Sequence, residues 1–326
     1  MNNDYHIKNI DQYHTAYKKS ISDPEKFWEE IASNNFLWHR KWDSVLKWDF
    51  SKPEIKWFDG AKLNITENCI DRHLESRGDK TAIIFEPNNP NENAQHITYS
   101  DLFKRVNKLA NVLKSLGIKK GDRVCIYIPM IPELAISLLA CARIGAIHSV
   151  VFAGFSANAL ATRINDSDCK MVITADGSFR GNKTIDLKGI VDEALETCQS
   201  IKTVLVVKRI MSDVNMKDGR DYWLAPLLEN ISEHCEAEIM DSEDPLFILY
   251  TSGSTGMPKG MVHTCAGYMI YTAYTFKNAF QYAENDVYWC TADIGWITGH
   301  SYIAVSYTHL RAHETEADLV CRLLLE

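Results

Sequence analysis

Residues 124–152 read VCIYIPMIPELAISLLACARIGAIHSVVF, and the fold class follows from this stretch. Apolar runs of strand length lie at 124–128 and 146–152, and an apolar run of helix length lies between them at 132–144. Gly145 ends the helix, where glycine is common because it tolerates a left-handed backbone conformation. Two buried strands joined by a helix are typical of a parallel βαβ unit, since parallel neighbours need a long crossover connection.

The same alternation of strands and helices continues on both sides of this unit. Ser156 is placed to cap a following helix, and the polar, irregular stretch 209–245 predicts a surface excursion. We therefore expect an α/β fold in which a mostly parallel sheet carries helices on both faces. The further elements that we expect are strands at 81–85, 170–174, 203–207 and 246–250, and helices at 101–116, 157–165 and 187–198.

Composition excludes several classes of protein. The chain has 326 residues, 46% of them hydrophobic, which allows a sizeable core in one large or two ordinary domains. Its 35 basic and 43 acidic residues give a net charge of 35 − 43 = −8, which argues against a nucleic-acid partner. The longest apolar region, 131–155, is interrupted by Glu133, Arg143 and His148, so we expect no association with a membrane.

Cysteines and histidines offer no catalytic pattern. The nine cysteines are scattered without a C-x-x-C pair, and no secretory signal precedes them, which favours a cytoplasmic protein with free thiols. His148 lies on an apolar strand and is interpreted as a core histidine. His263 and His300 lie near the motifs described below, but nothing in the sequence assigns either a role.

Aromatic residues are concentrated near the N-terminus. Five of the eight tryptophans fall within residues 1–60, at positions 28, 38, 42, 48 and 57. Aromatic rings are usually buried, so we interpret residues 1–65 as a segment that wraps around a larger domain. A peptide-binding or carbohydrate-binding surface is the alternative.

A loop rich in glycine and hydroxyl groups follows the strand at 246–250. It reads TSGSTGMPKG over 251–260, and its inward-turned N–H groups, hydroxyls and lysine suit a polyphosphate. It departs from the Walker pattern, because Pro258 stands where that pattern has its second glycine. A flexible surface turn is the alternative, which the preceding buried strand disfavours. The residues expected to contact phosphate are Thr251, Ser252, Gly253, Ser254, Thr255, Gly256 and Lys259.

This loop closely resembles the phosphate-binding signature of the adenylate-forming superfamily. Three further segments resemble AMP-forming acetyl-CoA synthetases: LNITEN at 63–68, ARIGAIHSVVFAGFS at 142–156 and TADIGWITGHSY at 291–302. The resemblance covers about residues 8–304. It implies the N-terminal part of the large domain of an adenylate-forming enzyme, with a truncated AMP-binding domain at 66–304 and no C-terminal domain.

The resemblance implies a two-step reaction that uses ATP, coenzyme A and normally Mg²⁺. Acetate attacks the α-phosphorus of ATP to give acetyl-AMP and pyrophosphate, and the thiol of coenzyme A then displaces AMP to give acetyl-CoA. The loop would hold the β- and γ-phosphates, with Lys259 and Thr255 in catalytic roles, mostly by positioning and charge neutralisation. The resemblance assigns no metal ligand within this chain.

A short basic stretch matches the coenzyme A site of the family. Its residues are Arg180, Gly181, Asn182 and Lys183, and Lys183 stands where many relatives have a second arginine. Guanidinium and ammonium groups would meet the phosphates of coenzyme A there. An ordinary solvated turn remains the alternative.

The carboxylate pocket is matched by the stretch 296–298. Trp296 resembles the aromatic gate of that pocket, Ile297 and Thr298 would line the acetate side, and Thr298 would also approach the thiol of coenzyme A. Without the resemblance, Trp296 would be interpreted as a core residue.

The resemblance ends near Ala304. The chain continues as SYTHLRAHETEADLVCRLLLE over 306–326, and we interpret residues 305–326 as a non-native tail of translated adapter sequence rather than an amphipathic helix. The family's adenine-binding and pocket-shortening segments do not occur in the sequence. We expect an inactive N-terminal fragment of an acetate–CoA ligase. The alternatives are a propionyl-CoA or other short-chain acyl-CoA synthetase, or a non-catalytic nucleotide- or CoA-binding fragment.

Overall fold

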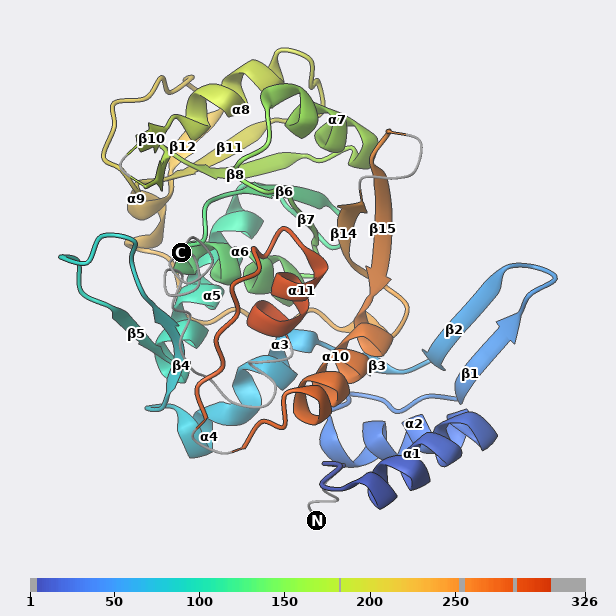
Figure 1. Cartoon of the computed structure of the whole chain (residues 1–326). Helices are drawn as coiled ribbons and strands as arrows, with labels where there is room; N and C mark the ends of the chain where they lie inside the picture. The colour runs from blue at the N-terminus through green and yellow to red at the C-terminus, as the bar shows by residue number, and fades with distance from the viewer. Residues whose placement is uncertain (1–4, 182, 252–255, 284–285, 306–326) are drawn as a thin grey trace.

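A seven-stranded sheet forms the centre of the computed structural model, which describes residues 5–181, 183–251, 256–283 and 286–305 (Figure 1). Its strand order is β12-β11-β8-β6-β7-β14-β15, in which the first six strands are parallel and β15 runs antiparallel to β14. The strands are β6 Arg123–Tyr127, β7 Ile147–Val150, β8 Met171–Ala175, β11 Thr203–Val207, β12 Asp221–Trp223, β14 Pro245–Thr251 and β15 Lys259–Thr264.

Helices cover both faces of this sheet. Figure 1 shows α7 and α8 on one face and α5 and α6 on the other. Ser156 caps α7 by accepting a hydrogen bond from the N–H of Ala159, as predicted, and Thr98 starts α5 with a capping box. These four helices are α5 Tyr99–Ser115, α6 Pro132–Arg143, α7 Ala157–Ser167 and α8 Leu187–Leu195.

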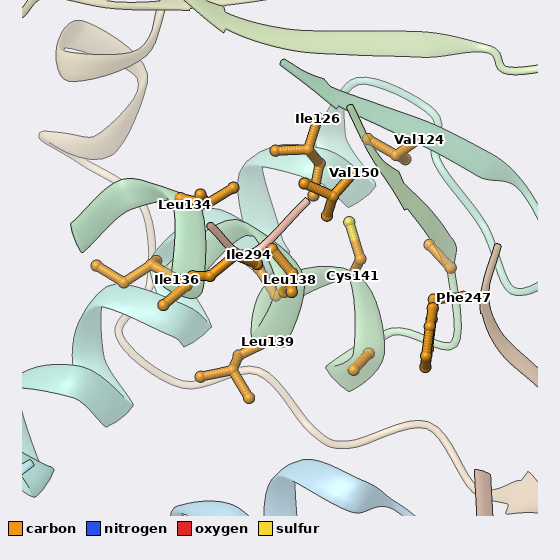
Figure 2. Close-up of a cluster of buried hydrophobic side chains, with 14 of the residues drawn as sticks. Val124, Ile126, Leu134, Ile136, Leu138, Leu139, Cys141, Val150, Phe247 and Ile294 are labelled. Carbon is orange, nitrogen blue, oxygen red and sulfur yellow. The ribbon is translucent and has the colours of Figure 1, made fainter. Parts of the chain in front are cut away.

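The core lies where α6 packs against the sheet. Figure 2 shows leucine and isoleucine side chains of α6 beside Val124, Ile126 and Val150 of β6 and β7. Each of these three strand residues is at most 4% exposed. The α/β fold expected from residues 124–152 is therefore confirmed, with helix and strand bounds within a few residues of those predicted.

Short elements complete the described chain. Four two-stranded antiparallel pairs lie outside the central sheet: β1 Ser44–Asp49 with β2 Glu54–Asp59, β3 Lys62–Leu63 with β13 Met240–Asp241, β4 Thr81–Phe85 with β5 Gln95–Thr98, and β9 Ser178–Arg180 with β10 Lys183–Ile185. The remaining helices are α1 Ile10–Ser22, α2 Pro24–Asn35, α3 Ile65–Cys69, η1 Asp71–His73, α4 Leu74–Arg77, α9 Leu224–Leu228, α10 Cys265–Ala279, α11 Ile297–Gly299 and η2 His300–Val305, the last a π-helix.

Two expectations from the sequence need correction. The strand predicted at 81–85 is confirmed as β4, but among the described strands it pairs with β5 in a hairpin and does not join the central sheet. Its alternate residues are partly exposed, whereas β8 is buried on both faces. The stretch 209–245 is not only a surface excursion, since its residues 221–223 form β12 at the edge of the central sheet. The polar Asp221 obscured that strand in the sequence; its carboxylate pairs with the buried Lys188, 2.9 Å away.

The N-terminal segment packs on α10. The ring of Trp28 in α2 lies 5.4 Å from that of Tyr274 in α10 and 6.4 Å from that of Trp57 in β2. Trp48 differs from these, because 59% of its side chain is exposed on the β1–β2 hairpin. Figure 1 shows this hairpin projecting from the body of the molecule.

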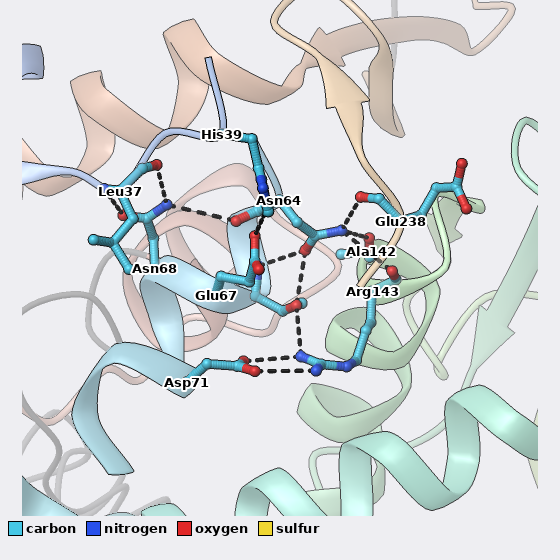
Figure 3. Close-up of polar contacts among 10 residues, drawn as sticks. Leu37, His39, Asn64, Glu67, Asn68, Asp71, Ala142, Arg143 and Glu238 are labelled. Carbon is cyan, nitrogen blue, oxygen red and sulfur yellow. Dashed lines mark hydrogen bonds and ion pairs between the residues drawn. The ribbon is translucent and has the colours of Figure 1, made fainter. Parts of the chain in front are cut away.

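Two of the segments that carry the family resemblance contact each other in the interior (Figure 3). The Asn64 amide donates to the backbone carbonyls of Ala142, Arg143 and Glu238, at 2.8–3.2 Å. The Arg143 guanidinium forms a bidentate pair with Asp71, at 2.8 and 3.0 Å. These residues therefore join α3 to the end of α6.

Candidate active site

The candidate site lies at the C-terminal edge of the central sheet, which is formed by the carboxyl ends of its parallel strands. Because β6, β7, β8 and β14 run in the same direction, the loops that follow them meet at one edge of the sheet, which is where open α/β sheets bind ligands. Three predicted groups of residues approach this edge. They are the ends of the phosphate loop at 251–260, the basic hairpin at 178–185 and the segment 291–298, which we call the Trp296 segment.

Two adjacent strands hold the ends of the phosphate loop. Thr251, the last residue of β14, is the cross-strand partner of Lys259, the first residue of β15. Gly256 has φ +79°, a conformation that favours glycine. Ser252, Gly253, Ser254 and Thr255 lie outside the described residues. Thr251 and Lys259 are eight positions apart in sequence, and the register between β14 and β15 places them opposite each other at the two ends of the loop.

Tyr250 anchors the strand end that precedes the loop. Its hydroxyl donates a 2.6 Å hydrogen bond to the carboxylate of Asp166 at the end of α7. Burial raises the pKa of Tyr250, and this hydrogen bond raises it further. The phenol therefore stays neutral and holds the end of β14 against α7.

A cavity of about 270 Å³ opens beside the basic hairpin. It brings Arg180 together with Phe152 from the loop after β7 and Asp293 from the Trp296 segment. Gly181 has φ +57° and forms the turn between β9 and β10, in which Arg180 is the cross-strand partner of Lys183. Asn182 lies outside the described residues.

Arg209 also lines this cavity, and sequence reasoning missed it. It lies two residues beyond the end of β11, at the same sheet edge as the other loops. A basic residue just after a buried parallel strand was the available signal.

The Trp296 segment is held against the loop after β7. The carboxylate of Asp293 accepts a 2.7 Å hydrogen bond from the N–H of Gly295. A Cβ on Gly295 would lie 3.1 Å from the backbone nitrogen of Phe152, so glycine permits this close approach. Burial raises the pKa of Asp293, and the Gly295 hydrogen bond opposes that shift. Asp293 thereby connects the Trp296 segment to the cavity that Arg180 lines.

Trp296 is not a core residue. Half of its side chain is exposed, and its ring lies 6.5 Å from Phe152 and 6.4 Å from Phe155. Ile297 and Thr298 follow it in α11 and are also exposed. This arrangement excludes the core interpretation and leaves the three side chains accessible at the sheet edge.

A buried pair of histidines includes His300, the residue that directly follows α11. His148 and His300 share a 2.8 Å hydrogen bond between their Nε2 atoms, and the Tyr268 hydroxyl lies 2.7 Å from Nδ1 of His300. Burial lowers the pKa of His148 to about 3 and that of His300 well below its usual value. The core interpretation of His148 is consistent with this burial, but its pairing with a residue 152 positions away was not predicted.

No described residues group three or more histidine, cysteine, aspartate or glutamate side chains in a way that could hold a metal ion. The described residues therefore offer no cage of three or more such side chains for the Mg²⁺ that the resemblance implies. Eight cysteines of the described chain are buried free thiols. Among the described helices, none has both the length and the apolar character that a membrane span requires.

Comparison with known proteins identifies the family of this chain. Residues 70–312 match the family model of AMP-binding enzymes, and residues 13–69 match that of the acetyl-coenzyme A synthetase N-terminus. The chain is 56% identical over 293 residues to an acetyl-coenzyme A synthetase of Alkalilimnicola ehrlichii, covering 90% of this chain and 45% of the relative. It is 55% identical over 300 residues to one of Halorhodospira halophila, covering 92% and 46%.

A solved structure shares the fold. The acetoacetyl-CoA synthetase from Streptomyces lividans superposes with a TM-score of 0.84 at 23% identity, over 93% of this chain and 46% of that one. This chain thus spans about half the length of the relatives that it matches. The chain belongs to the AMP-binding enzyme family, and its residues 13–69 match the model of the acetyl-coenzyme A synthetase N-terminus.

Proposed function

We propose that this chain supplies the phosphate-holding and coenzyme A-facing half of an AMP-forming acetate–CoA ligase. The reaction joins acetate to the α-phosphorus of ATP with release of pyrophosphate, and then transfers the acetyl group to the thiol of coenzyme A with release of AMP. Residues 1–65 would form the N-terminal segment, residues 66–304 would belong to the AMP-binding domain, and residues 305–326 would be non-native.

The observation that carries the proposal is a shared sheet edge. The paired loop ends Thr251 and Lys259, the half-exposed Trp296 and the cavity beside Arg180 all lie there. In the proposed reaction the ammonium group of Lys259 neutralises charge on the departing pyrophosphate. Trp296 borders the acyl group, and Arg180 holds a phosphate of coenzyme A.

A chimera tests the proposal. Residues 1–302 are joined to the C-terminal remainder of the Alkalilimnicola ehrlichii relative, and acetate-dependent pyrophosphate release is followed with acetyl-CoA formation. We expect both activities, with Lys259→Ala slowing adenylate formation about 100-fold while the affinity for coenzyme A is unchanged. The unaltered relative serves as the positive control.

Three outcomes would contradict parts of the proposal. A folded chimera that activates no carboxylate would contradict the ligase function. Faster turnover with propionate than with acetate would favour the other short-chain synthetases. Turnover by the 326-residue chain alone would contradict the expectation that it is inactive by itself, whereas binding of coenzyme A without turnover would support a binding role for the isolated chain.

A further inference from the structure

We propose that Arg209 is a further coenzyme A-binding residue, whose guanidinium holds phosphate together with that of Arg180. The inference rests on the proposed function, because it takes coenzyme A as the ligand of the cavity beside the basic hairpin. Both arginines line this cavity, although Arg180 belongs to β9 and Arg209 follows β11. Two guanidinium groups converging on one opening suit a ligand that carries several phosphates.

Aromatic rings hold the Arg209 side chain in place. Its guanidinium carbon lies 5.2 Å from the ring centroid of Phe179 and 5.7 Å from that of Phe85, and both rings line the cavity. The Arg209 side chain is 19% exposed. Much of the entropy cost of ordering this long side chain is therefore met before a ligand binds.

A buried carboxylate fixes the backbone that carries Arg209. Asp176, which is fully buried just beyond β8, accepts hydrogen bonds from the N–H groups of Arg209 at 2.7 Å, Ile210 at 3.1 Å and Ser212 at 3.2 Å. It also accepts one from its neighbour Gly177, at 2.8 Å. Asp176 is thus a positioning residue, because it ties the loop after β11 to the strand that leads into the basic hairpin.

Most of the donors of Arg209 remain available to a ligand. Among the described residues, the ionic contact of its guanidinium is with Glu92, and the 3.5 Å separation is at the outer limit of a hydrogen bond. Guanidinium has five N–H donors, so several can meet an anion. The Glu92 carboxylate would compete with that anion for the guanidinium. Removing the charge of Arg209 should therefore weaken ligand binding, whereas removing the charge of Glu92 should tighten it.

Titration of coenzyme A into the 326-residue chain tests the inference. We expect Arg209→Gln to weaken binding about tenfold or more and Arg209→Lys to weaken it less, because lysine retains the charge but not the planar fork. Glu92→Gln should tighten binding about twofold to threefold. Lys208→Ala is the matched control: it also removes one positive charge, but Lys208 lies 4.8 Å from the ring of Trp223 and does not line the cavity.

The results separate this inference from the proposed function. If Arg209→Gln binds coenzyme A as tightly as the unsubstituted chain while Arg180→Ala binds it weakly, Arg209 has no such role and the proposed function stands. If neither the unsubstituted chain nor the folded chimera binds coenzyme A, the proposed site itself is wrong. Thermal melting of each variant confirms that it folds, and the opposite effect of Glu92→Gln would not arise if Arg209 were merely structural.

Discussion

Arg143 illustrates how a residue in a family motif can serve structure. Its side chain is 3% exposed, and its guanidinium donates to the Cys235 carbonyl at 2.6 Å and to the Thr66 hydroxyl at 3.1 Å, in addition to its pair with Asp71. These partners compensate the cost of burying the Arg143 charge. Removing the Arg143 side chain leaves the Asp71 carboxylate and the Cys235 carbonyl without their donor.

Substitution of Arg143 should therefore destabilise the fold. We expect Arg143→Ala to lower the free energy of unfolding by about 3–5 kcal/mol, measured by urea denaturation. Arg105→Ala, at an exposed position of α5, is the control and should change it by less than about 0.5 kcal/mol. Equal stability of the two variants would show that the Arg143 network contributes little.

The buried histidines predict a dependence of stability on pH. Burial holds the pKa of His148 at about 3, below its usual value of 6.5, so the unfolded chain binds more protons whenever the pH lies between these values. Stability is therefore full above pH 6.5 and falls as the pH decreases toward 3. At pH 5 the loss from His148 is about 2 kcal/mol, and the lowered pKa of His263 and of His300 acts in the same direction.

Urea unfolding between pH 5 and 7 measures this effect. We expect His148→Phe to reduce the slope of stability against pH by up to about 1.4 kcal/mol per pH unit, because one buried titrating group has been removed. Replacement of the exposed His234 by glutamine is the matched control. An unchanged slope in the His148 variant would mean that the ring is accessible to protons in the folded state.

At the scale of elements, α11 depends on the absence of a side chain at Gly299. A Cβ there would lie 2.3 Å from the Asp293 carbonyl oxygen and 2.6 Å from that of Ala292. Both are backbone atoms, so α11 would have to move away from the segment that carries Trp296. The short helix and the preceding turn therefore form one unit.

Gly299→Ala should displace α11. In the chimera we expect the KM for acetate to rise about tenfold with a loss of stability, because a shift of the Trp296 segment alters the acyl side of the site. Gly267→Ala in α10 provides the contrast, since its Cβ would lie 3.7 Å or more from its neighbours and alanine favours helix. Normal acetate kinetics in Gly299→Ala would separate α11 from the acyl site.

At the scale of the whole molecule, the N-terminal segment and α10 stabilise each other. Phe27, Trp28 and Tyr274 form a cluster with ring centroids 5.1–5.7 Å apart, and Trp57 and Tyr271 extend it. Such packing couples residues near the start of the chain to residues more than 240 positions later.

The N-terminal segment and the sheet should therefore unfold together. We expect tryptophan fluorescence and far-UV circular dichroism to give coincident melting curves. Trp28→Ala should lower the free energy of unfolding by about 3 kcal/mol, whereas Trp48→Ala, at an exposed position, should change it by less than about 0.5 kcal/mol. A separate early fluorescence transition would indicate that the segment folds independently of the sheet.

The elements that the sequence predicted well are those with a strong local signal. Helix 132–143 is long, and strands 123–127 and 203–207 each contain four consecutive apolar residues, so their apolar patterns identify them without knowledge of their neighbours. β12 was missed because three residues that begin with a charged Asp221 have no such period. The residues of the site were named from motifs, whereas Arg209 belongs to no motif that the sequence displayed.

The sequence by itself determined the α/β class, the order of the central βαβ units and the resemblance to adenylate-forming enzymes, because periodicity and motifs are local properties of the chain. Tertiary structure alone decided that Arg209 joins Arg180 at one cavity, that Arg143 binds Asp71 and that His148 pairs with His300. The partners in these contacts lie 29, 72 and 152 positions apart, by subtraction of their residue numbers. Parallel strand order and the packing of α6 and α11 bring them together, and no local pattern specifies that long-range arrangement.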